Sequence, residues 1–301
     1  MFDITKVPSQ KGKIAIVTGA NAGLGYETAL ALAKLDTKVI MACRNTSKAE
    51  KARKAILEQV PKGELEVMAL DLSKLEAVRK FAETFLAKYD QIDLLINNAG
   101  IMIPPLSKTE DGFESQMAAN YFGHFLLTGL LLKTINNTPN ARIVALSSKA
   151  HENGKIDFDN LHAEKSYSKI GAYSQSKLAC HMFSYELQRR LEKAGHKTIS
   201  VVAHPGVSDT ELGRHISKVL LFIFYPMLLM MTHKPVKAAL PQLMAALDED
   251  VQGGDYFGPT GFREMKGAPG KVKAAPQAHD ENIQKKLWEK SEKLVNFEFE
   301  F

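Results

Sequence analysis

Residues 13–35, KIAIVTGANAGLGYETALALAKL, decide the fold. Residues 13–18 are an apolar, β-branched run whose apolar side chains fall on both faces, which predicts a fully buried strand. Residues 26–35 are rich in Ala and Leu and contain neither Gly nor Pro, so they predict a helix. Three glycines lie between the strand and the helix: Gly19, Gly23 and Gly25. A glycine turn before a helix N-terminus exposes N–H groups and the positive end of the helix dipole, which predicts a phosphate-binding site.

The glycine spacing is Gly-x-x-x-Gly-x-Gly, not the more common Gly-x-Gly-x-x-Gly of dinucleotide-binding proteins. A glycine cluster alone is equally typical of an ordinary flexible turn. The strand before this cluster and the helix after it favour the nucleotide interpretation.

The rest of the chain alternates strands and helices. Further strands are predicted at residues 37–42, 65–70, 92–96, 141–146 and 198–203. Further helices are predicted at 47–59, 74–89, 112–134, 171–194, 234–247 and 280–294. Strict alternation with long crossover helices predicts an α/β fold of the Rossmann type, a doubly wound parallel sheet with helices on both faces.

No linker divides the chain before about residue 205, so we expect one domain over residues 1–301. Within it, residues 207–247 are expected to form an apolar substrate lid and residues 253–301 a C-terminal tail. Polar or glycine-rich clusters follow the predicted strands at 19–25, 43–45, 71–72, 97–100, 147–148 and 204–210. Because ligands bind beyond the carboxyl ends of parallel strands, we expect one ligand cleft along this edge of the sheet.

Composition excludes several classes of protein. The net charge of +5 is mild, and Lys residues are interspersed with Glu, so no nucleic-acid partner is expected. Cys43 and Cys180 lie far apart, which indicates a reducing compartment without disulfides or a metal site. Residues 1–10 do not resemble a signal peptide, so we expect a cytoplasmic protein.

The longest apolar run, residues 219–231, is interrupted by Pro226 and is too short to span a membrane. It is also too apolar for an exposed loop. Three interpretations stay open: a lid over an apolar substrate, a surface that contacts a membrane or a second subunit, and plain core.

Tyr173 and Lys177 stand four residues apart in a predicted helix, which places both side chains on one face. A free tyrosine, with a pKa near 10, is too weak an acid for fast proton transfer at neutral pH. A cation about 4 Å away, at an effective dielectric constant of about 20, contributes about 4 kcal/mol and lowers that pKa by a few units. The spacing also occurs by chance on helix surfaces, so the other motifs must decide.

Those motifs occur in the order typical of one family, and the chain resembles the short-chain dehydrogenase/reductase family over nearly its whole length. Residues 18–25 match its Thr-Gly-x-x-x-Gly-x-Gly loop, and residues 97–100 match its Asn-Asn-Ala-Gly segment. Pro205 and Gly206, with Thr210, match the element after its sixth strand. The residues that match its catalytic tetrad are Asn120, Ser148, Tyr173 and Lys177.

The resemblance implies a role for each member of the tetrad. Tyr173 gives the proton to the carbonyl oxygen on reduction and takes it from the alcohol on oxidation, while Ser148 hydrogen-bonds the same oxygen. Lys177 lowers the pKa of the tyrosine and holds the nicotinamide ribose, and Asn120 holds a water that links Lys177 to solvent. Ser147 is the neighbouring alternative, but the family places its catalytic serine second in Ser-Ser. The hydride comes from the cofactor, so the protein supplies position and electrostatics.

The resemblance also implies the cofactor-binding residues: Gly19, Asn21, Gly23, Leu24, Gly25, Arg44, Asp71, Leu72, Asn98, Ala99, Gly100, Tyr173, Lys177, Pro205, Gly206, Val207 and Thr210. NAD enzymes usually carry an acidic residue after the second strand, where this chain has Cys43, Arg44 and Asn45. An arginine fork suits a 2′-phosphate, which a carboxylate would repel, and Asn21 can add a donor. We therefore expect NADP(H); if Arg44 only stacks on the adenine, the preference is weak and NAD(H) also serves.

Within the family, the chain is most similar to the retinol dehydrogenase branch, which includes WW-domain oxidoreductases and protochlorophyllide reductases. The similarity lies in Ala42-Cys-Arg, in His204 before Pro-Gly, in the segment 254–259, and in the interval of 25 residues from Ser148 to Tyr173. That long interval implies a loop at 150–170 that covers part of the site. Its two histidines, His151 and His162, are interpreted as loop-surface residues rather than ligands.

We expect an NADP(H)-dependent oxidoreductase that interconverts a carbonyl and an alcohol on a fairly apolar, retinoid- or lipid-like substrate. One alternative is a C=C reductase of the protochlorophyllide type. Another is a non-catalytic NADP(H)-binding regulator, which would not need the tetrad. The family commonly pairs through its two long helices, here 112–134 and 171–194, which implies a homodimer or homotetramer.

Overall fold

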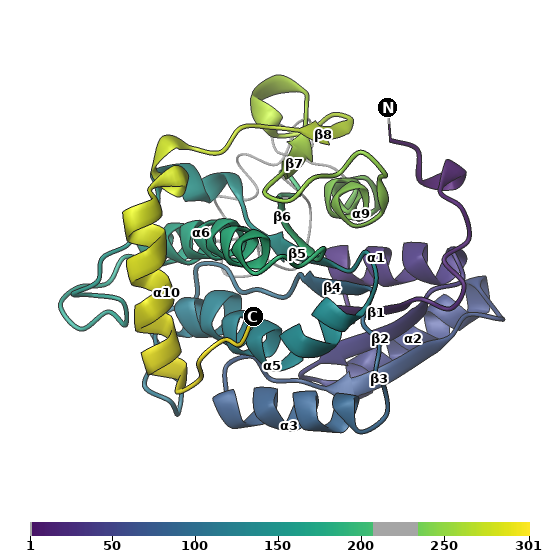
Figure 1. The fold of residues 1–301 in the computed structure, drawn as a ribbon, viewed down its shortest axis with the longest axis horizontal. Helices are drawn as coiled ribbons and strands as arrows, with labels where there is room; N and C mark the ends of the chain where they lie inside the picture. Colours follow the sequence, from purple (N-terminus) through teal and green to yellow (C-terminus); the bar gives the residue numbers. More distant parts are fainter. Residues whose placement is uncertain (1, 207–233) are drawn as a thin grey trace, which may run out of the picture.

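The structure is a computed structural model that describes residues 2–206 and 234–301. One eight-stranded sheet runs through it in the order β3-β2-β1-β4-β5-β6-β7-β8 (Figure 1). Neighbouring strands are parallel except β7 and β8, which are antiparallel. The predicted fold class, a Rossmann-type doubly wound sheet, is confirmed. The strand order reverses between β1 and β4, and doubly wound sheets bind ligands at that point.

The six strands predicted from the sequence all form, with ends within two residues of the expected ones. The elements up to β4 are η1 Ile4–Lys6, β1 Ile14–Thr18, α1 Gly23–Lys34, β2 Lys38–Cys43, α2 Thr46–Gln59, β3 Leu65–Ala69, α3 Leu75–Leu86 and β4 Leu94–Asn97. Those that follow, up to the segment not described, are α4 Ser115–Met117, η2 Ala118–Phe122, α5 Gly123–Asn137, β5 Arg142–Leu146, η3 Lys149–Asn153, α6 Lys169–Lys193 and β6 Ile199–Ala203.

The helix expected at 112–134 forms with shifted ends and is not a single α-helix. The helical run begins at Ser115, ends at Asn137 and contains a π-helical turn, η2, between α4 and α5. Gly123 follows this turn at a close approach to another segment: a Cβ there would lie 2.3 Å from the carbonyl oxygen of Leu72. One-turn π segments inside α-helices are frequent at functional sites, and this one contains Asn120.

The C-terminal part holds two strands that the sequence analysis did not predict. Its elements are α8 Pro235–Ala238, α9 Leu240–Leu247, β7 Tyr256–Pro259, η5 Phe262–Glu264, β8 Pro269–Lys271, η6 Pro276–His279 and α10 Glu281–Val295. The helix expected at 234–247 is divided in two at Ala239. β7 and β8 have four and three residues, and both contain Gly and Pro, which are depleted in strands.

Two apolar clusters cover the two faces of the sheet. One gathers α3, α5, α6 and α10 around the aromatic side chains of Phe81, Phe125, Phe183 and Trp288. The other gathers α1, α2 and α9, with Ile56 and Leu243 buried. α10 lies against α6 at the outer side of the first cluster (Figure 1). Within residues 2–206 and 234–301, no helix is long and apolar enough to cross a membrane.

Candidate active site

The glycine turn connects β1 to α1, and its shape depends on residues without a Cβ. Gly19 and Gly23 have φ of +69° and +54°, in the left-handed region that favours glycine. A Cβ on Gly25 would lie 2.4 Å from the carbonyl oxygen of Gly19 and 2.6 Å from Nδ2 of Asn98. α1 begins at Gly23, and its N-cap, Ala22, makes no side-chain cap. The first N–H groups of this helix are therefore left to bind an anion.

Thr18, the last residue of β1, joins the glycine turn to the end of β4. Its Oγ1 accepts hydrogen bonds of 2.9 Å from the backbone N–H groups of Asn98 and Ala99. Asn98 Nδ2 donates in return to the carbonyl oxygen of Thr18 at 2.7 Å. The two segments that the resemblance assigns to the cofactor are thus held together by one threonine.

His124 extends this connection to Asn120, and sequence reasoning missed it. Its Nδ1 lies 2.9 Å from the carbonyl oxygen of Asn120 and its Nε2 lies 2.9 Å from Thr18 Oγ1. A carbonyl oxygen only accepts, so Nδ1 carries the proton and Nε2 accepts from the Thr18 hydroxyl. Burial lowers the pKa of His124 to about 4, which keeps the ring neutral. The spacing of four residues from Asn120 on a helix was the signal that could have found it.

Asn120 directs its side chain to the segment after β4. Its Oδ1 accepts from the backbone N–H of Ile101 at 2.8 Å, and its Nδ2 donates to the Ile101 carbonyl and to Ser176 Oγ. A Cβ on Gly100 would lie 3.1 Å from Asn120 Oδ1 and 3.5 Å from Lys177 Nζ. The structure therefore brings Asn120, Gly100 and Lys177 together.

Tyr173 and Lys177 lie one turn apart on α6, and both are buried. Nζ of Lys177 lies 5.9 Å from the centre of the Tyr173 ring and donates a 2.9 Å hydrogen bond to the carbonyl oxygen of Leu146, the last residue of β5. Ser147 Oγ donates to the carbonyl oxygen of Lys177 at 2.9 Å. Ser147, the alternative to Ser148, is thus engaged with the backbone of α6.

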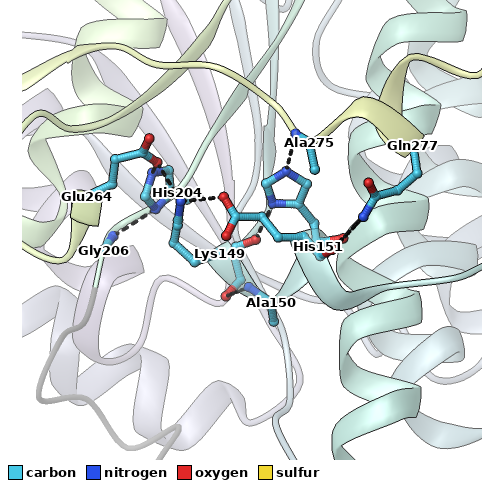
Figure 2. Close-up of polar contacts among 10 residues, drawn as sticks. Lys149, Ala150, His151, His204, Gly206, Glu264, Ala275 and Gln277 are labelled. Atoms are coloured by element: carbon cyan, nitrogen blue, oxygen red, sulfur yellow. Dashed lines mark hydrogen bonds and ion pairs between the residues drawn. The ribbon is translucent and has the colours of Figure 1, made fainter.

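Ser148 follows β5 and is the N-cap of η3. Its Oγ accepts the N–H of Ala150 at 3.2 Å, and its carbonyl oxygen accepts from Nδ1 of His151 at 2.7 Å (Figure 2). The interpretation of His151 as a loop-surface residue is wrong, because its side chain is fully buried. This burial lowers the pKa of its imidazole. His162 is partly buried and stacks on Phe113, with ring centres 5.0 Å apart.

The remaining predicted residues lie in the glycine turn, at the start of α1 and after the ends of β2, β3 and β6. Arg44 is exposed directly after β2, and Asn21 is half-buried in the glycine turn. Asp71 Oδ1 accepts from the backbone N–H and the hydroxyl of Ser73, two residues on, as in an Asx turn. Leu24 and Leu72 are buried. Pro205 and Gly206 follow β6, whereas Val207, Thr210 and the apolar run 219–231 lie outside the described residues.

Both cysteines are buried and free. Burial raises the pKa of Cys43 to about 11, and Cys180 donates from its thiol to the carbonyl oxygen of Asn120. In the part of the chain that the structure describes, no cluster of three or more His, Cys, Asp or Glu side chains is placed to hold a metal ion.

A glycine turn before an uncapped helix, with a buried Tyr-Lys pair at the end of β5, defines a nucleotide-dependent oxidoreductase site on a doubly wound sheet. The chain belongs to the short chain dehydrogenase family, whose model matches residues 13–220. It is an NAD(P)-dependent oxidoreductase that acts on CH–OH groups.

Two human proteins illustrate the similarity. The chain is 41% identical to retinol dehydrogenase 14 of Homo sapiens, over 94% of this chain and 86% of that protein. It is 40% identical to human retinol dehydrogenase 12, over 96% of this chain and 88% of that protein. These relatives support the retinol dehydrogenase-like branch that the sequence motifs indicated.

Solved structures share the fold. A protein of Mycobacterium paratuberculosis superposes with a TM-score of 0.82 at 37% identity and covers 100% of this chain and 99% of its own. A short chain dehydrogenase of Shigella flexneri, solved in complex with NADP, superposes with a TM-score of 0.65 at 21% identity. That match covers 83% of this chain and 98% of the Shigella protein.

Proposed function

We propose that this protein interconverts a carbonyl and an alcohol on a fairly apolar substrate, uses NADP(H), and does so as one cytoplasmic domain. The observation that carries the proposal is the attachment of the Tyr173 turn of α6 to the end of β5. Lys177 Nζ and the Lys177 carbonyl oxygen make hydrogen bonds to Leu146 and Ser147, the two residues before Ser148. This attachment fixes the phenol of Tyr173 relative to the strand end that carries the Ser148 hydroxyl.

Each residue of the tetrad has one task in this proposal. Tyr173 transfers the proton to or from the substrate oxygen, and Ser148 hydrogen-bonds that oxygen and orients it. Lys177 supplies positive charge beside the phenol when the proton leaves. Asn120, held by Ile101 and Ser176, keeps the segment after β4 beside Lys177. General acid–base catalysis of this kind contributes about 10²- to 10⁴-fold to the rate.

The residues present fit a dinucleotide. Gly19 and Gly25 leave no Cβ in the turn, and the uncapped N-terminus of α1 suits a pyrophosphate. Asp71 and Leu72 would lie against the adenine, and Asn98, Ala99 and Gly100 against the ribose and nicotinamide side. Pro205 and Gly206, continued by Val207 and Thr210, would complete that side. The bound cofactor supplies the hydride, which no side chain can supply.

The preference for NADP(H) depends on charge at the end of β2. Arg44 is exposed there, and Cys43 and Asn45 beside it bring no carboxylate. A guanidinium can bind a 2′-phosphate with two parallel hydrogen bonds, whereas NAD enzymes use an acidic residue at this place.

Apolar side chains near α6 support the apolar substrate. Ile170, one turn before Tyr173, is 65% exposed, and Leu106 is 47% exposed. The loop that carries Leu106 is joined to the start of α6, because Tyr167 Oη donates to the carbonyl oxygen of Pro104 at 3.0 Å. The relatives are named for retinol, an apolar alcohol, which agrees with this choice.

Turnover of NADPH and NADH against aldehydes and ketones of increasing length, retinal included, tests the proposal. We expect oxidation of NADPH with the longer apolar carbonyls, and about 10³-fold less in Tyr173→Phe with little change in NADPH affinity. Tyr185→Phe, which removes a hydroxyl from the same helix three turns later, should retain activity.

Two outcomes would contradict the proposal. Reduction of conjugated double bonds but not of carbonyls would favour the C=C reductase. Binding of NADPH without turnover, unchanged in Tyr173→Phe, would favour the regulator.

A further inference from the structure

Glu264 lies between the two segments that hold Ser148 and Gly206, although it is more than fifty residues from either in the sequence. Its Oε2 lies 3.2 Å from Nζ of Lys149, the residue after Ser148, and 3.3 Å from Nε2 of His204 (Figure 2). One carboxylate therefore contacts the chain after β5 and the chain after β6.

His204 passes this contact on to Gly206. Its Nδ1 accepts the backbone N–H of Gly206 at 3.2 Å, so the proton of the neutral ring is on Nε2, the atom that faces Glu264. The imidazole is fully buried and fits because residue 258 is glycine: a Cβ on Gly258 would lie 1.9 Å from His204 Nε2. Gly206 in turn has φ of +72°, and a Cβ there would lie 2.4 Å from the carbonyl oxygen of Met265. The turn that carries Glu264 thus packs directly on Gly206.

The backbone at Glu264 has a strained conformation that non-glycine residues rarely adopt. Arg263 and Glu264 have φ of 48° and 55°, two consecutive non-glycine residues in the left-handed region. Such conformations persist only where surrounding contacts hold them, and they cluster at functional sites. The contacts of Glu264 with Lys149 and His204 join this turn to the chain after β5 and after β6, beside the turn's own backbone hydrogen bonds from Glu264 N–H to Gly261 and from Met265 N–H to Phe262.

We propose that Glu264 is a positioning residue that fixes the Ser148 turn and the Gly206 turn relative to each other. The inference rests on the proposed function, in which Ser148 orients the substrate oxygen and Gly206 lies on the nicotinamide side. Misplacement of a reacting group by about 1 Å can cost on the order of a hundredfold in rate, so a bridge between the two turns affects catalysis without touching substrate.

The site offers a matched pair of variants. Lys149 also pairs with Glu152, but that ion pair lies within η3 and joins nothing to β6. Glu264→Gln and Glu152→Gln therefore each remove one negative charge next to the same ammonium, and only Glu264→Gln removes the bridge.

Hydrogen exchange of the free protein gives a readout that needs neither cofactor nor substrate. We expect the amides of Ala150, His151 and Gly206, which are bonded to Ser148 or His204, to exchange at least about tenfold faster in Glu264→Gln than in wild type. Glu152→Gln should leave the amide of Gly206 unchanged. Equal exchange of that amide in all three proteins would overturn the proposal.

Steady-state kinetics supply the second readout. For Glu264→Gln we expect kcat to fall about tenfold and KM for NADPH to rise several-fold, while Tm changes by no more than about 2 °C. Lys149→Met should lower kcat similarly, and Glu264→Gln should add little to it, because the two residues act through one contact. A loss of Tm with unchanged kcat and KM, or independent effects of the two substitutions, would show a merely structural role.

The pH profile tests the contact between Glu264 and His204. The ionisable groups around His204 are Lys149, His151 and Glu152 on η3, His181 on α6, Tyr256 on β7 and Glu264 on η5. Burial lowers the pKa of His204, and the Glu264 carboxylate offsets part of that shift. Protonated His204 cannot accept the N–H of Gly206, so Glu264→Gln, which lowers the pKa of His204 further, should move the acid limb of kcat/KM to lower pH. If the acid limb of kcat/KM lies at the same pH in Glu264→Gln and in wild type, the role proposed for Glu264 is contradicted. If the wild-type protein turns over no carbonyl or alcohol, the proposed function fails, and the exchange experiment still decides whether Glu264 holds the two turns.

Discussion

Two parts of the molecule contribute to the site in different ways: the parallel part, residues 2–206 with strands β1 to β6, and the C-terminal part, residues 234–301 with helices α8 to α10 and strands β7 and β8. The parallel part carries all the described residues assigned to cofactor and chemistry. The C-terminal part carries none of them but contacts their neighbours: Ala275 N–H donates to His151 Nε2, and Gln277 Nε2 donates to the carbonyl oxygens of His151 and Glu152 (Figure 2). The positions of the reacting groups in the parallel part therefore depend on contacts with the C-terminal part.

A second contact of this kind lies on the other face of the sheet. Gln242, fully buried on α9, directs Nε2 to Thr28 Oγ1 on α1 and lies 3.4 Å from Asn98 Oδ1. The residues after 233 thus contact η3, which follows Ser148, and also Thr28 of α1 and Asn98 after β4.

The largest expected effect is on stability and comes from Trp288→Ala in α10. The indole is fully buried, and its ring centre lies 5.1 Å from Phe125 and 5.7 Å from Phe183. Removing such a side chain leaves a cavity and costs about 3–5 kcal/mol of the free energy of unfolding, to be measured by urea denaturation. Phe301→Ala, at the 38% exposed C-terminus, should cost less than about 1 kcal/mol.

If Trp288→Ala were no more destabilising than Phe301→Ala, α10 would not be an integral part of the fold.

The same helix also matters for the expected homodimer or homotetramer, which stays a prediction. Tyr121 Oη lies 2.7 Å from Ser291 Oγ, and Phe297 packs over Gly129 of α5. Pairing through this face of α5 and α6 would first have to displace α10.

The next effect, on the pH dependence of stability, tests the parallel part. Burial lowers the pKa of His124 to about 4, whereas a histidine in an unfolded chain has a pKa near 6.5. Below pH 6.5 the unfolded chain binds a proton that the folded chain does not. The stabilisation is therefore complete above pH 6.5 and is lost as the pH falls to about 4, in total on the order of 3 kcal/mol.

His124→Asn should flatten this part of the stability profile, and His196→Gln, in the turn after α6, should leave it unchanged. Denaturation midpoints between pH 4 and pH 7 provide the measurement. An equally steep profile in His124→Asn would mean that the neutral ring between Thr18 and Asn120 is not the source of the effect.

The two parts also differ in how far the sequence could predict them. Local patterns sufficed for β1 to β6, because a buried parallel strand is a continuous apolar run and because each motif follows its strand directly. The tetrad and the glycine turn could be assigned by resemblance for the same reason: each motif is short and has its own spacing. The π-helical turn at Asn120 was not predicted, because residues 115–137 show one continuous helical pattern; the close approach of Gly123 to Leu72 beside it is a contact between segments far apart in the sequence.

The C-terminal part could not be predicted in this way. β7 and β8 are too short and too rich in Gly and Pro to show a strand pattern. His151 was assigned to the surface because its burial depends on Ala275 and Gln277, more than a hundred residues away. The contact of Glu264 with Lys149 spans 115 residues, and no local periodicity signals an ion pair at that separation.

The smallest expected effect concerns the choice between NADPH and NADH, which we expect to depend on the parallel part alone. Arg44→Gln should lower kcat/KM with NADPH by about tenfold, close to 1.4 kcal/mol, and leave NADH nearly unchanged, because only NADPH has the 2′-phosphate that the guanidinium would bind. Lys48→Gln, an exposed cation in the first turn of α2, is the matched control and should change neither value much. Equal losses with both cofactors would mean that Arg44 stacks on the adenine that they share, and the preference for NADP(H) would then need another source. A loss with NADPH alone would place the whole choice of cofactor within two residues of the end of β2, with no contribution from the C-terminal part.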